Sequence, residues 1–383
     1  MNLPAASIHS LEALMREAYD VFVSESPDPD EDVCLLYTSG TTAEPKGVRL
    51  SAENVAAEQE ATEQALEIRP QDRLLGVLPF FHVFGLSNVL HLALIHGASV
   101  ALVPQYSPAA LLKMIVETRP TLILAIPTIL LHLQAIIARK GLSLPQSVRL
   151  CVSGAAPLPA EAVEMLEETL GARVLEGYGL TETVAACCLN PPGGVSKAGS
   201  IGLPLNGFEM AIVDEQGRPV PIGQVGEIAV KGKGVTRGYF NLPDETRKAC
   251  VNGWFLTGDL GYQDTDGYFF VTDRKKEIIV KAGLNISPRE VEAALCTHPA
   301  VEEAAVVGRR KAEREEIVAF VLAAKPVSRK ELISHCRNLL AAFKVPDVIR
   351  FRDTLPRSMT GKVLKRQLMK EADDASGTGP KKT

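Results

Sequence analysis

The sequence has few cysteines and no pairing pattern among them. Seven cysteines occur in 383 residues. They form neither a Cys-x-x-Cys pair nor a cluster with histidine, which excludes a small disulfide-bonded scaffold and the common kinds of zinc site. We therefore expect buried free thiols and a reducing, cytoplasmic environment.

Long apolar runs and an excess of positive charge are also absent. The most apolar stretch, residues 83–103, is interrupted by polar residues and a glycine, so it predicts a buried helix followed by a strand and not a transmembrane segment. The formal net charge of -5 provides no general field that would attract nucleic acid or a membrane surface. The start of the chain lacks the basic and apolar regions of a signal peptide.

Strand-like and helix-like segments alternate along the first half of the chain. Strands are expected at residues 33–37, 74–78, 99–103, 122–125, 148–152 and 174–176. Helices are expected at residues 52–68, 86–96, 108–118, 128–139 and 159–170. This order predicts an α/β fold whose mainly parallel sheet is covered by helices.

The second half has a different pattern. Short strands at 208–213, 226–231 and 267–272 predict a small β subdomain. After the charged run at 273–276, a capping box at 287–290 predicts a helix over 288–296, followed by strands at 302–307 and 316–323 and a helix from 328. We expect an N-terminal domain at 1–272 (an α/β core at 31–198 and a β subdomain at 199–272), a mobile α+β C-terminal domain at 273–370, and a disordered tail at 371–383.

A hydroxyl-rich turn, YTSGTTAEPKG at residues 37–47, resembles a phosphate-binding loop. Residues 38–42 are small or hydroxylated and offer backbone and side-chain donors, and Lys46 adds a positive charge on a flexible stem. The spacing does not fit a Walker A motif. An ordinary surface loop is the alternative interpretation.

Three further segments carry residue types that suit a nucleotide. Tyr178, between two glycines after a predicted strand, could stack on a planar base, and Glu182 is an oxygen ligand suited to Mg²⁺. Asp259 follows a glycine and could accept hydrogen bonds from the two hydroxyls of a ribose, although a β-turn would explain it equally well. Lys362 lies in a predicted irregular loop, where most lysines are simply solvated.

Together these segments resemble the adenylate-forming (AMP-binding) superfamily, most closely its fatty-acyl-CoA synthetases. The motifs that carry the resemblance occur in the family's order, at residues 37–47, 80–85 (FFHVFG), 177–183 (GYGLTET), 252–260 (NGWFLTGDL), 273–277 (DRKKE) and 360–362 (TGK). The resemblance covers residues 31–370. It implies the predicted α/β fold and an enzyme that uses ATP, Mg²⁺ and coenzyme A.

The resemblance also implies a role for individual residues. Phosphate- and nucleotide-binding roles fall on Thr38, Ser39, Gly40, Thr41, Thr42, Lys46, Gly154, Ala155, Ala156, Gly177, Tyr178, Gly179, Thr181, Asp259 and Arg274. Glu182 and Thr42 would hold Mg²⁺, and Asp259 and Arg274 would bind the ribose. His82 would border the acyl pocket and the thiol path.

The reaction that the resemblance implies has two steps. A carboxylate attacks the α-phosphorus of ATP and expels pyrophosphate, and a thiol then attacks the carbonyl of the acyl-adenylate. Lys362 would bridge the carboxylate and the α-phosphate in the first step. The C-terminal domain would then rotate about Lys276, and Gly283 would enter the site to line the thiol channel.

Two features leave the function open. Family members carry a longer segment before residue 37, so this chain is a short form, a fragment, or a protein completed by a second copy or by a separate N-terminal polypeptide. Residues 82–87, 124–128 and 154–157 are apolar or small, which favours a medium- or long-chain fatty acid without excluding aromatic acids. The alternatives are an enzyme that loads a carrier-protein phosphopantetheine, and a non-catalytic nucleotide or acyl-adenylate binder.

Overall fold

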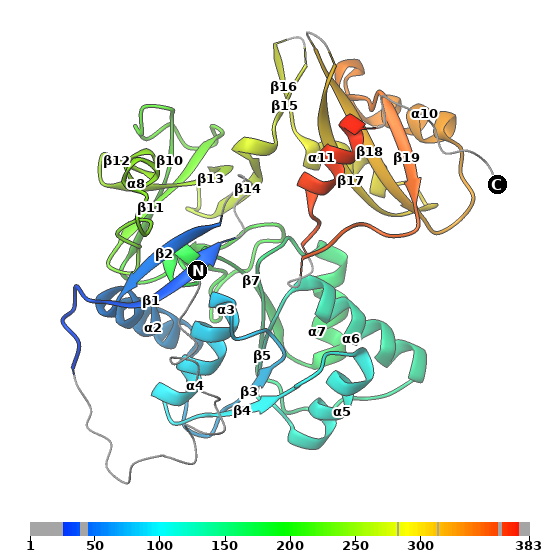
Figure 1. Cartoon of the computed structure of the whole chain (residues 1–383). Helices are drawn as coiled ribbons and strands as arrows, with labels where there is room; N and C mark the ends of the chain where they lie inside the picture. The colour runs from blue at the N-terminus through cyan, green and yellow to red at the C-terminus, as the bar shows by residue number, and fades with distance from the viewer. Residues whose placement is uncertain (1–25, 39–44, 282, 312–313, 359–361, 375–383) are drawn as a thin grey trace, which may run out of the picture.

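The computed structural model describes residues 26–38, 45–281, 283–311, 314–358 and 362–374. A seven-stranded sheet, with strand order β4-β3-β5-β6-β7-β8-β9, forms the centre of the first half of the chain. The pairs from β4 to β7 are parallel, whereas β8 and β9 are antiparallel additions. Helices α5 to α7 lie on one side of this sheet and α2 and α4 on the other (Figure 1). The predicted α/β fold is therefore confirmed.

The bounds of the central strands and helices lie close to the predicted ones. The strands are β3 Arg73–Gly76, β4 Ser99–Leu102, β5 Leu122–Ala125, β6 Leu150–Ser153, β7 Arg173–Tyr178, β8 Cys188–Leu189 and β9 Leu203–Pro204. The helices are α2 Ala52–Leu66, α3 Val83–Gly85, the π-helix η2 Leu86–His91, α4 Leu92–Ile95, α5 Pro108–Thr118, α6 Pro127–Lys140 and α7 Ala160–Leu170. Strands β5 and β6 are buried at every position because helices cover both faces of the sheet.

A hairpin and a second sheet flank the central sheet. Strands β1 Asp32–Thr38 and β2 Lys46–Ser51 pair so that Thr38 lies opposite Lys46. The second sheet contains β10 Phe208–Val213, β11 Gly226–Gly232, β12 Cys250–Val251, β13 Trp254–Gln263 and β14 Phe269–Arg274. The segment around Asp259 is therefore a strand, and the β-turn alternative is wrong.

The C-terminal lobe, residues 279–374, is a separate body in Figure 1. It contains β15 Ile279–Lys281, β16 Leu284–Ile286, α9 Pro288–Cys296, β17 Val301–Lys311, β18 Arg314–Ala323, α10 Arg329–Leu339, β19 Val348–Arg352 and α11 Lys365–Asp374. Its buried apolar residues form clusters of their own, apart from the large cluster that spans residues 61–269. Helix α11 continues through Asp374, so residues 371–374 are helical and not the start of a disordered tail; residues 375–383 lie outside the described part.

Cysteine burial and membrane topology were both predicted from the sequence. All seven cysteines are free, but Cys250 and Cys296 are exposed, so the expectation that the thiols are buried is wrong for these two. In the described part of the chain, no helix combines the length and the apolar character that a membrane crossing requires.

Candidate active site

Asp259, Arg274 and Tyr178 form a hydrogen-bonded cluster at the edge of the second sheet. Asp259 on β13 and Arg274 on β14 are direct partners across the ladder. The Nε of Arg274 donates to Oδ1 of Asp259 at 3.0 Å, and the hydroxyl of Tyr178 donates to Oδ2 at 2.6 Å. Burial and the neighbouring Asp259 charge raise the pKa of Tyr178 well above its usual value, so its hydroxyl stays a donor.

The glycines of the predicted nucleotide wall are required by close packing. A β-carbon at Gly179 would lie 1.3 Å from the carbonyl oxygen of Ala185, and one at Gly154 would lie 3.2 Å from the ring of Phe84. Ala155 has a positive φ of 70°, a conformation that is strained for a residue with a β-carbon. Close packing at Gly179 and Gly154 and the positive φ of Ala155 therefore constrain the backbone of these two segments.

Glu182 and Lys46 are linked through Tyr239, which the sequence analysis did not identify. Glu182 lies in the short 3-10 helix η3 Thr181–Thr183, and its Oε1 accepts a hydrogen bond from the Tyr239 hydroxyl at 2.9 Å. The ammonium of Lys46 lies 4.8 Å from the centre of the Tyr239 ring and forms an ion pair with Glu245. No motif marks Tyr239 or Glu245, because a tyrosine and an acidic helix start are common in any surface segment.

The predicted phosphate loop is described only at its two ends. Thr38 and Lys46 face each other where β1 and β2 end, and the Thr38 hydroxyl donates to the Lys46 carbonyl at 3.5 Å. Ser39, Gly40, Thr41 and Thr42 lie outside the described residues. The Mg²⁺ role that was predicted for Thr42 is therefore untested.

His82 and Lys362 influence each other electrostatically. His82 precedes α3, and its Nδ1 accepts a hydrogen bond from the backbone N–H of Phe84 at 3.3 Å. Burial lowers the pKa of His82, and the charge of Lys362 lowers it further, so the imidazole is neutral at neutral pH. The π-helix η2 that follows is a form found frequently at functional sites.

The charges of Arg274 and Asp259 both act on the ammonium of Lys362. The residue is accessible to solvent, yet the protein around its ammonium lowers its pKa, and the charge of Arg274 acts in the same direction. Its backbone N–H donates to the Ser358 hydroxyl at 3.2 Å, and the backbone N–H of Ser358 donates to the Lys362 carbonyl at 2.8 Å. Lys365, which follows this loop, pairs with Glu277 just before the C-terminal lobe at 2.9 Å and with Glu292 inside the lobe at 2.8 Å.

The structure does not bring Gly283 to this cluster. Gly283 lies in the turn between β15 and β16, has a φ of 78°, and a β-carbon there would touch no other atom within 4 Å. Figure 1 shows this hairpin extending away from the central sheet. Lys276 lies in the short 3-10 helix Lys275–Glu277, and its neighbour Lys275 pairs with Glu227 at 2.9 Å.

Comparison with protein-family models identifies the family of the chain. The AMP-binding enzyme model matches residues 5–240, and the AMP-binding enzyme C-terminal domain model matches residues 290–362.

The chain belongs to the AMP-binding enzyme family.

Two curated relatives of this AMP-binding enzyme carry different acids in their names. The long-chain-fatty-acid–CoA ligase of Bacillus subtilis is 39% identical over 377 residues, which cover 96% of this chain and 67% of the relative. The sulfoacetate–CoA ligase of Cupriavidus necator is 40% identical over 351 residues, which cover 90% of this chain and 68% of the relative.

One solved relative indicates which arrangement of the lobes is present here. ATP-bound MatB from Rhodopseudomonas palustris superimposes with a TM-score of 0.88 at 31% identity, covering 95% of this chain and 73% of MatB. The apo form of the same protein superimposes with a TM-score of only 0.69 over a similar share. The two MatB forms share a sequence, so the difference between their TM-scores comes from a difference in conformation. The AMP-binding enzyme described here is closer in conformation to the ATP-bound form.

A buried polar network connects helix α2 to the π-helix η2. Glu58 on α2 has no exposed surface, and its carboxyl group accepts hydrogen bonds from five donors at 2.9 to 3.2 Å. These donors are the Thr62 and Ser87 hydroxyls, the Gln59 and Asn88 amides and the backbone N–H of Ala186. The network therefore joins α2 to the π-helix after His82 and to the loop after Glu182. Burial raises the pKa of Glu58 despite these hydrogen bonds.

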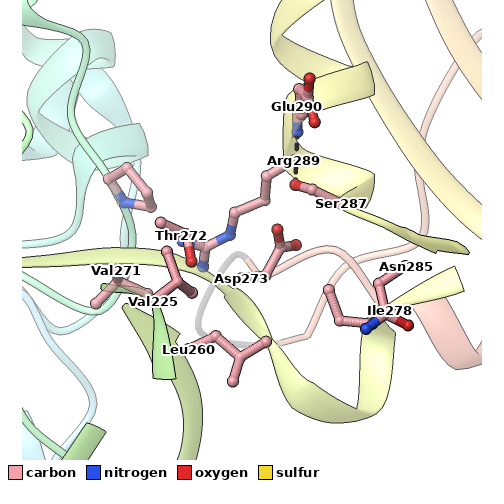
Figure 2. Close-up of a pocket in the computed structure, with 11 residues that line it drawn as sticks. Val225, Leu260, Val271, Thr272, Asp273, Ile278, Asn285, Ser287, Arg289 and Glu290 are labelled. Atoms are coloured by element: carbon pink, nitrogen blue, oxygen red, sulfur yellow. Dashed lines mark hydrogen bonds between the residues drawn. The ribbon is translucent and has the colours of Figure 1, made fainter. Parts of the chain in front are cut away.

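A cavity in the described part of the enzyme lies on the other side of the β13–β14 ribbon. It has a volume of about 600 Å³. Leu260 and Asp273 line it, and they alternate along the strands with Asp259 and Arg274, which face the opposite side. Figure 2 shows Arg289 extending from the start of α9 towards Thr272 across this space. None of the predicted site residues lines the cavity.

Proposed function

We propose that this AMP-binding enzyme is an AMP-forming acid–thiol ligase, which activates a carboxylic acid with ATP and transfers the acyl group to coenzyme A. The observation that supports this most directly is the hydrogen-bonded Tyr178–Asp259–Arg274 cluster, whose Asp259 and Arg274 charges act on Lys362. A cation within the field of a ribose-binding carboxylate suits the stabilisation of charge that develops on the α-phosphate. The names of the relatives support coenzyme A as the acceptor.

The donor set fits a nucleoside triphosphate. Asp259 now accepts one hydrogen bond on each oxygen, and a carboxylate has enough lone pairs to accept two ribose hydroxyls as well. Lys46 would hold phosphate oxygens at the end of the β1–β2 hairpin, and Tyr178 would lie against the base. Mg²⁺ held by Glu182 and Thr42 would neutralise phosphate charge.

The first step then depends mainly on Lys362. Its ammonium would bind one oxygen of the acid and one of the α-phosphate, and so hold the nucleophile in line while negative charge develops. The charge of Arg274 lowers the pKa of Lys362. The negative charges of the acid and of the phosphates would raise it again and keep the ammonium charged. The neutral imidazole of His82 would border the acyl group without adding charge.

The second step requires a different arrangement of the C-terminal lobe. We propose that residues 273–370 form a domain that rotates about Lys276, removes Lys362 from the site and brings Gly283 to it. The exposed position and positive φ of Gly283 suit close approach to a thiol. The cytoplasm is the compartment that this reaction and the free cysteines favour, and completion of the fold by a second copy or an N-terminal polypeptide stays a prediction.

The acid is the open part of the proposal. The apolar and small residues at 82–87, 124–128 and 154–157 favour a medium- or long-chain fatty acid, and the Bacillus subtilis relative supports that choice. The sulfoacetate ligase shows that relatives of similar identity act on a small, charged acid. The substrate panel should therefore include acetate, sulfoacetate, benzoate, octanoate and palmitate.

Acid-dependent exchange of pyrophosphate into ATP tests the first step. We expect exchange with at least one acid of the panel and, with coenzyme A added, formation of its thioester. Exchange followed by transfer only to carrier-protein phosphopantetheine would reject coenzyme A as the acceptor. No exchange with any acid would reject the ligase and leave a nucleotide or acyl-adenylate binder.

Replacing Tyr178 by Phe tests the nucleotide assignment. The change removes one hydrogen bond to the Asp259 carboxylate but keeps the ring that would stack on the base, so we expect the KM for ATP to rise about tenfold with little change in kcat. Tyr262→Phe is the matched control, because Tyr262 lies on the same strand as Asp259 but stacks on Phe270. Equal effects of the two changes would contradict the assignment.

A further inference from the structure

Lys46 has two partners within the protein, an acidic side chain and an aromatic ring. Its ammonium forms an ion pair with the carboxylate of Glu245 and lies over the ring of Tyr239. The exposed fraction of the side chain is only 17% for Lys46 and 33% for Glu245. A cation that is expected to bind phosphate is therefore neutralised by the protein itself.

The segment that carries Glu245 is fixed to the β1–β2 hairpin. The backbone N–H of Phe240 donates to the Gly47 carbonyl at 2.8 Å, and Val48 and Tyr239 form an isolated β-bridge. The hydroxyl of Thr246 accepts a hydrogen bond from the backbone of Tyr239 at 2.9 Å. These contacts connect helix α8, Pro243–Ala249, and the segment before it to the hairpin that carries Lys46.

Glu245 also has a second cation within reach. Its other carboxylate oxygen, Oε1, accepts from Lys248 one turn further along α8 at 2.9 Å. Glu245 lies in the first turn of this helix, where the backbone N–H groups favour a negative charge. When a phosphate takes Lys46, the Glu245 carboxylate therefore still has Lys248 and the helix start to stabilise it.

We propose that Glu245 is an exchangeable counter-ion for Lys46, which the phosphates of ATP displace on binding and which recaptures Lys46 to expel pyrophosphate. The proposal rests on the phosphate-binding role of Lys46 in the proposed function. Glu245 is thus a positioning residue that sets the strength of phosphate binding. Glu245 would lower the affinity of the site for every phosphate ligand and would therefore increase the rate at which pyrophosphate dissociates.

The Glu245→Gln variant tests this directly by calorimetric titration of the full chain with inorganic pyrophosphate and with Mg·ATP. We expect pyrophosphate to bind about tenfold more tightly, because the competing charge-assisted pair is removed, and ATP to bind more tightly to a similar extent. In the exchange assay, pyrophosphate should inhibit the forward reaction at about tenfold lower concentration. Asp244→Asn is the matched control, since Asp244 is the neighbouring acid in the same helix turn but pairs with Arg247.

A double-mutant cycle separates a direct pair from a general charge effect. In a Lys46→Met background, Glu245→Gln should change pyrophosphate affinity by less than about twofold. The Lys248→Met variant should act in the opposite sense to Glu245→Gln and weaken pyrophosphate binding, because Glu245 then has Lys46 as its remaining cation. Glu245→Asp retracts the carboxylate by one methylene and gives an intermediate result if the glutamine variant folds poorly.

Three outcomes would overturn the proposal. The first is an equal effect of Glu245→Gln and Asp244→Asn on pyrophosphate affinity, and the second is an undiminished effect of Glu245→Gln in the Lys46→Met background. The third is weaker binding of Mg·ATP by the Glu245→Gln variant, which would make Glu245 a metal ligand. The titrations need no acid substrate and no turnover. A failure of the ligase function in the exchange assay would therefore be distinguishable from a failure of the counter-ion.

Discussion

Lys362→Ala should reduce acid-dependent pyrophosphate exchange about 10²- to 10³-fold, as the loss of a charged group at a developing negative charge does in other enzymes. Formation of the coenzyme A thioester from a supplied acyl-adenylate should fall less than about tenfold, because the proposed rotation removes Lys362 from the site for that step. The two half-reactions are measured separately, by exchange of labelled pyrophosphate and by release of AMP from the adenylate in the presence of coenzyme A.

Two control variants make this result specific. Lys370→Ala removes an exposed lysine from α11 of the same lobe and should leave both half-reactions unchanged. Lys362→Arg keeps the charge with a different shape and should recover part of the exchange rate. Equal losses in both half-reactions for Lys362→Ala would contradict the proposal that one lysine serves only the first step.

Glu58→Ala should lower the free energy of unfolding by about 3 to 5 kcal/mol, since three buried donors lose their acceptor at about 1 to 3 kcal/mol each, while the Gln59 and Asn88 amides keep a second one. Urea denaturation followed by circular dichroism measures the change. Glu60→Ala is the matched control, because Glu60 is exposed on the same helix and its loss should alter stability by less than about 0.5 kcal/mol. An effect of Glu58→Ala as small as that of Glu60→Ala would contradict the network.

The raised pKa of Glu58 gives this network a pH dependence of known sign. A carboxyl whose pKa is higher in the folded than in the unfolded protein favours folding when it is protonated. Its contribution is fully present below the ordinary pKa of glutamate and is lost as the pH rises through the raised value. The Glu58→Gln variant should therefore show a smaller loss of stability with rising pH across this range than the wild type does.

Several elements could be read from the sequence because local signals and tertiary packing agree. Helix α5 begins at Pro108 and ends at Thr118 as predicted, because Ser107 caps it and its apolar residues repeat with the helical period. Strand β5 is a fully buried run of four apolar residues between a loop and a helix. Helix α9 likewise starts after the capping hydroxyl of Ser287.

Strand β13 could not be recognised, because its sequence contains signals for a turn. Gly258 has a φ of 76° within the strand, and a β-carbon at Gly261 would lie 2.2 Å from the Phe270 carbonyl. Glycine is required here by the close approach of β14, and in isolation it predicts a break. The role predicted for Asp259 does not depend on this error, because the motif, and not the element, suggested a ribose contact.

The polar partners of the site residues could not be predicted from sequence patterns. Helix α2 buries Asn54, Glu58, Gln59 and Thr62, which a hydrophobic pattern assigns to the solvent side. Tyr239 and Glu245 meet Lys46 from almost two hundred residues away, and a contact at that separation leaves no periodic trace in one sequence. Motifs therefore predicted individual residues of the candidate site, whereas only the structure identified the residues that bind to them.

The ladder between β13 and β14 has a consequence for the fate of the intermediate. Arg274 and Asp259 are both held by main-chain pairing within the second sheet, and Arg274 precedes Lys276, the proposed pivot. Although Arg274 falls within residues 273–370, its pairing with Asp259 would keep the predicted ribose contact on the stationary side of the proposed pivot, while Lys362 would belong to the side that departs. An acyl-adenylate bound through its sugar would stay in place as its phosphate loses Lys362, so a reactive mixed anhydride would be kept from diffusing away and hydrolysing before the thiol arrives.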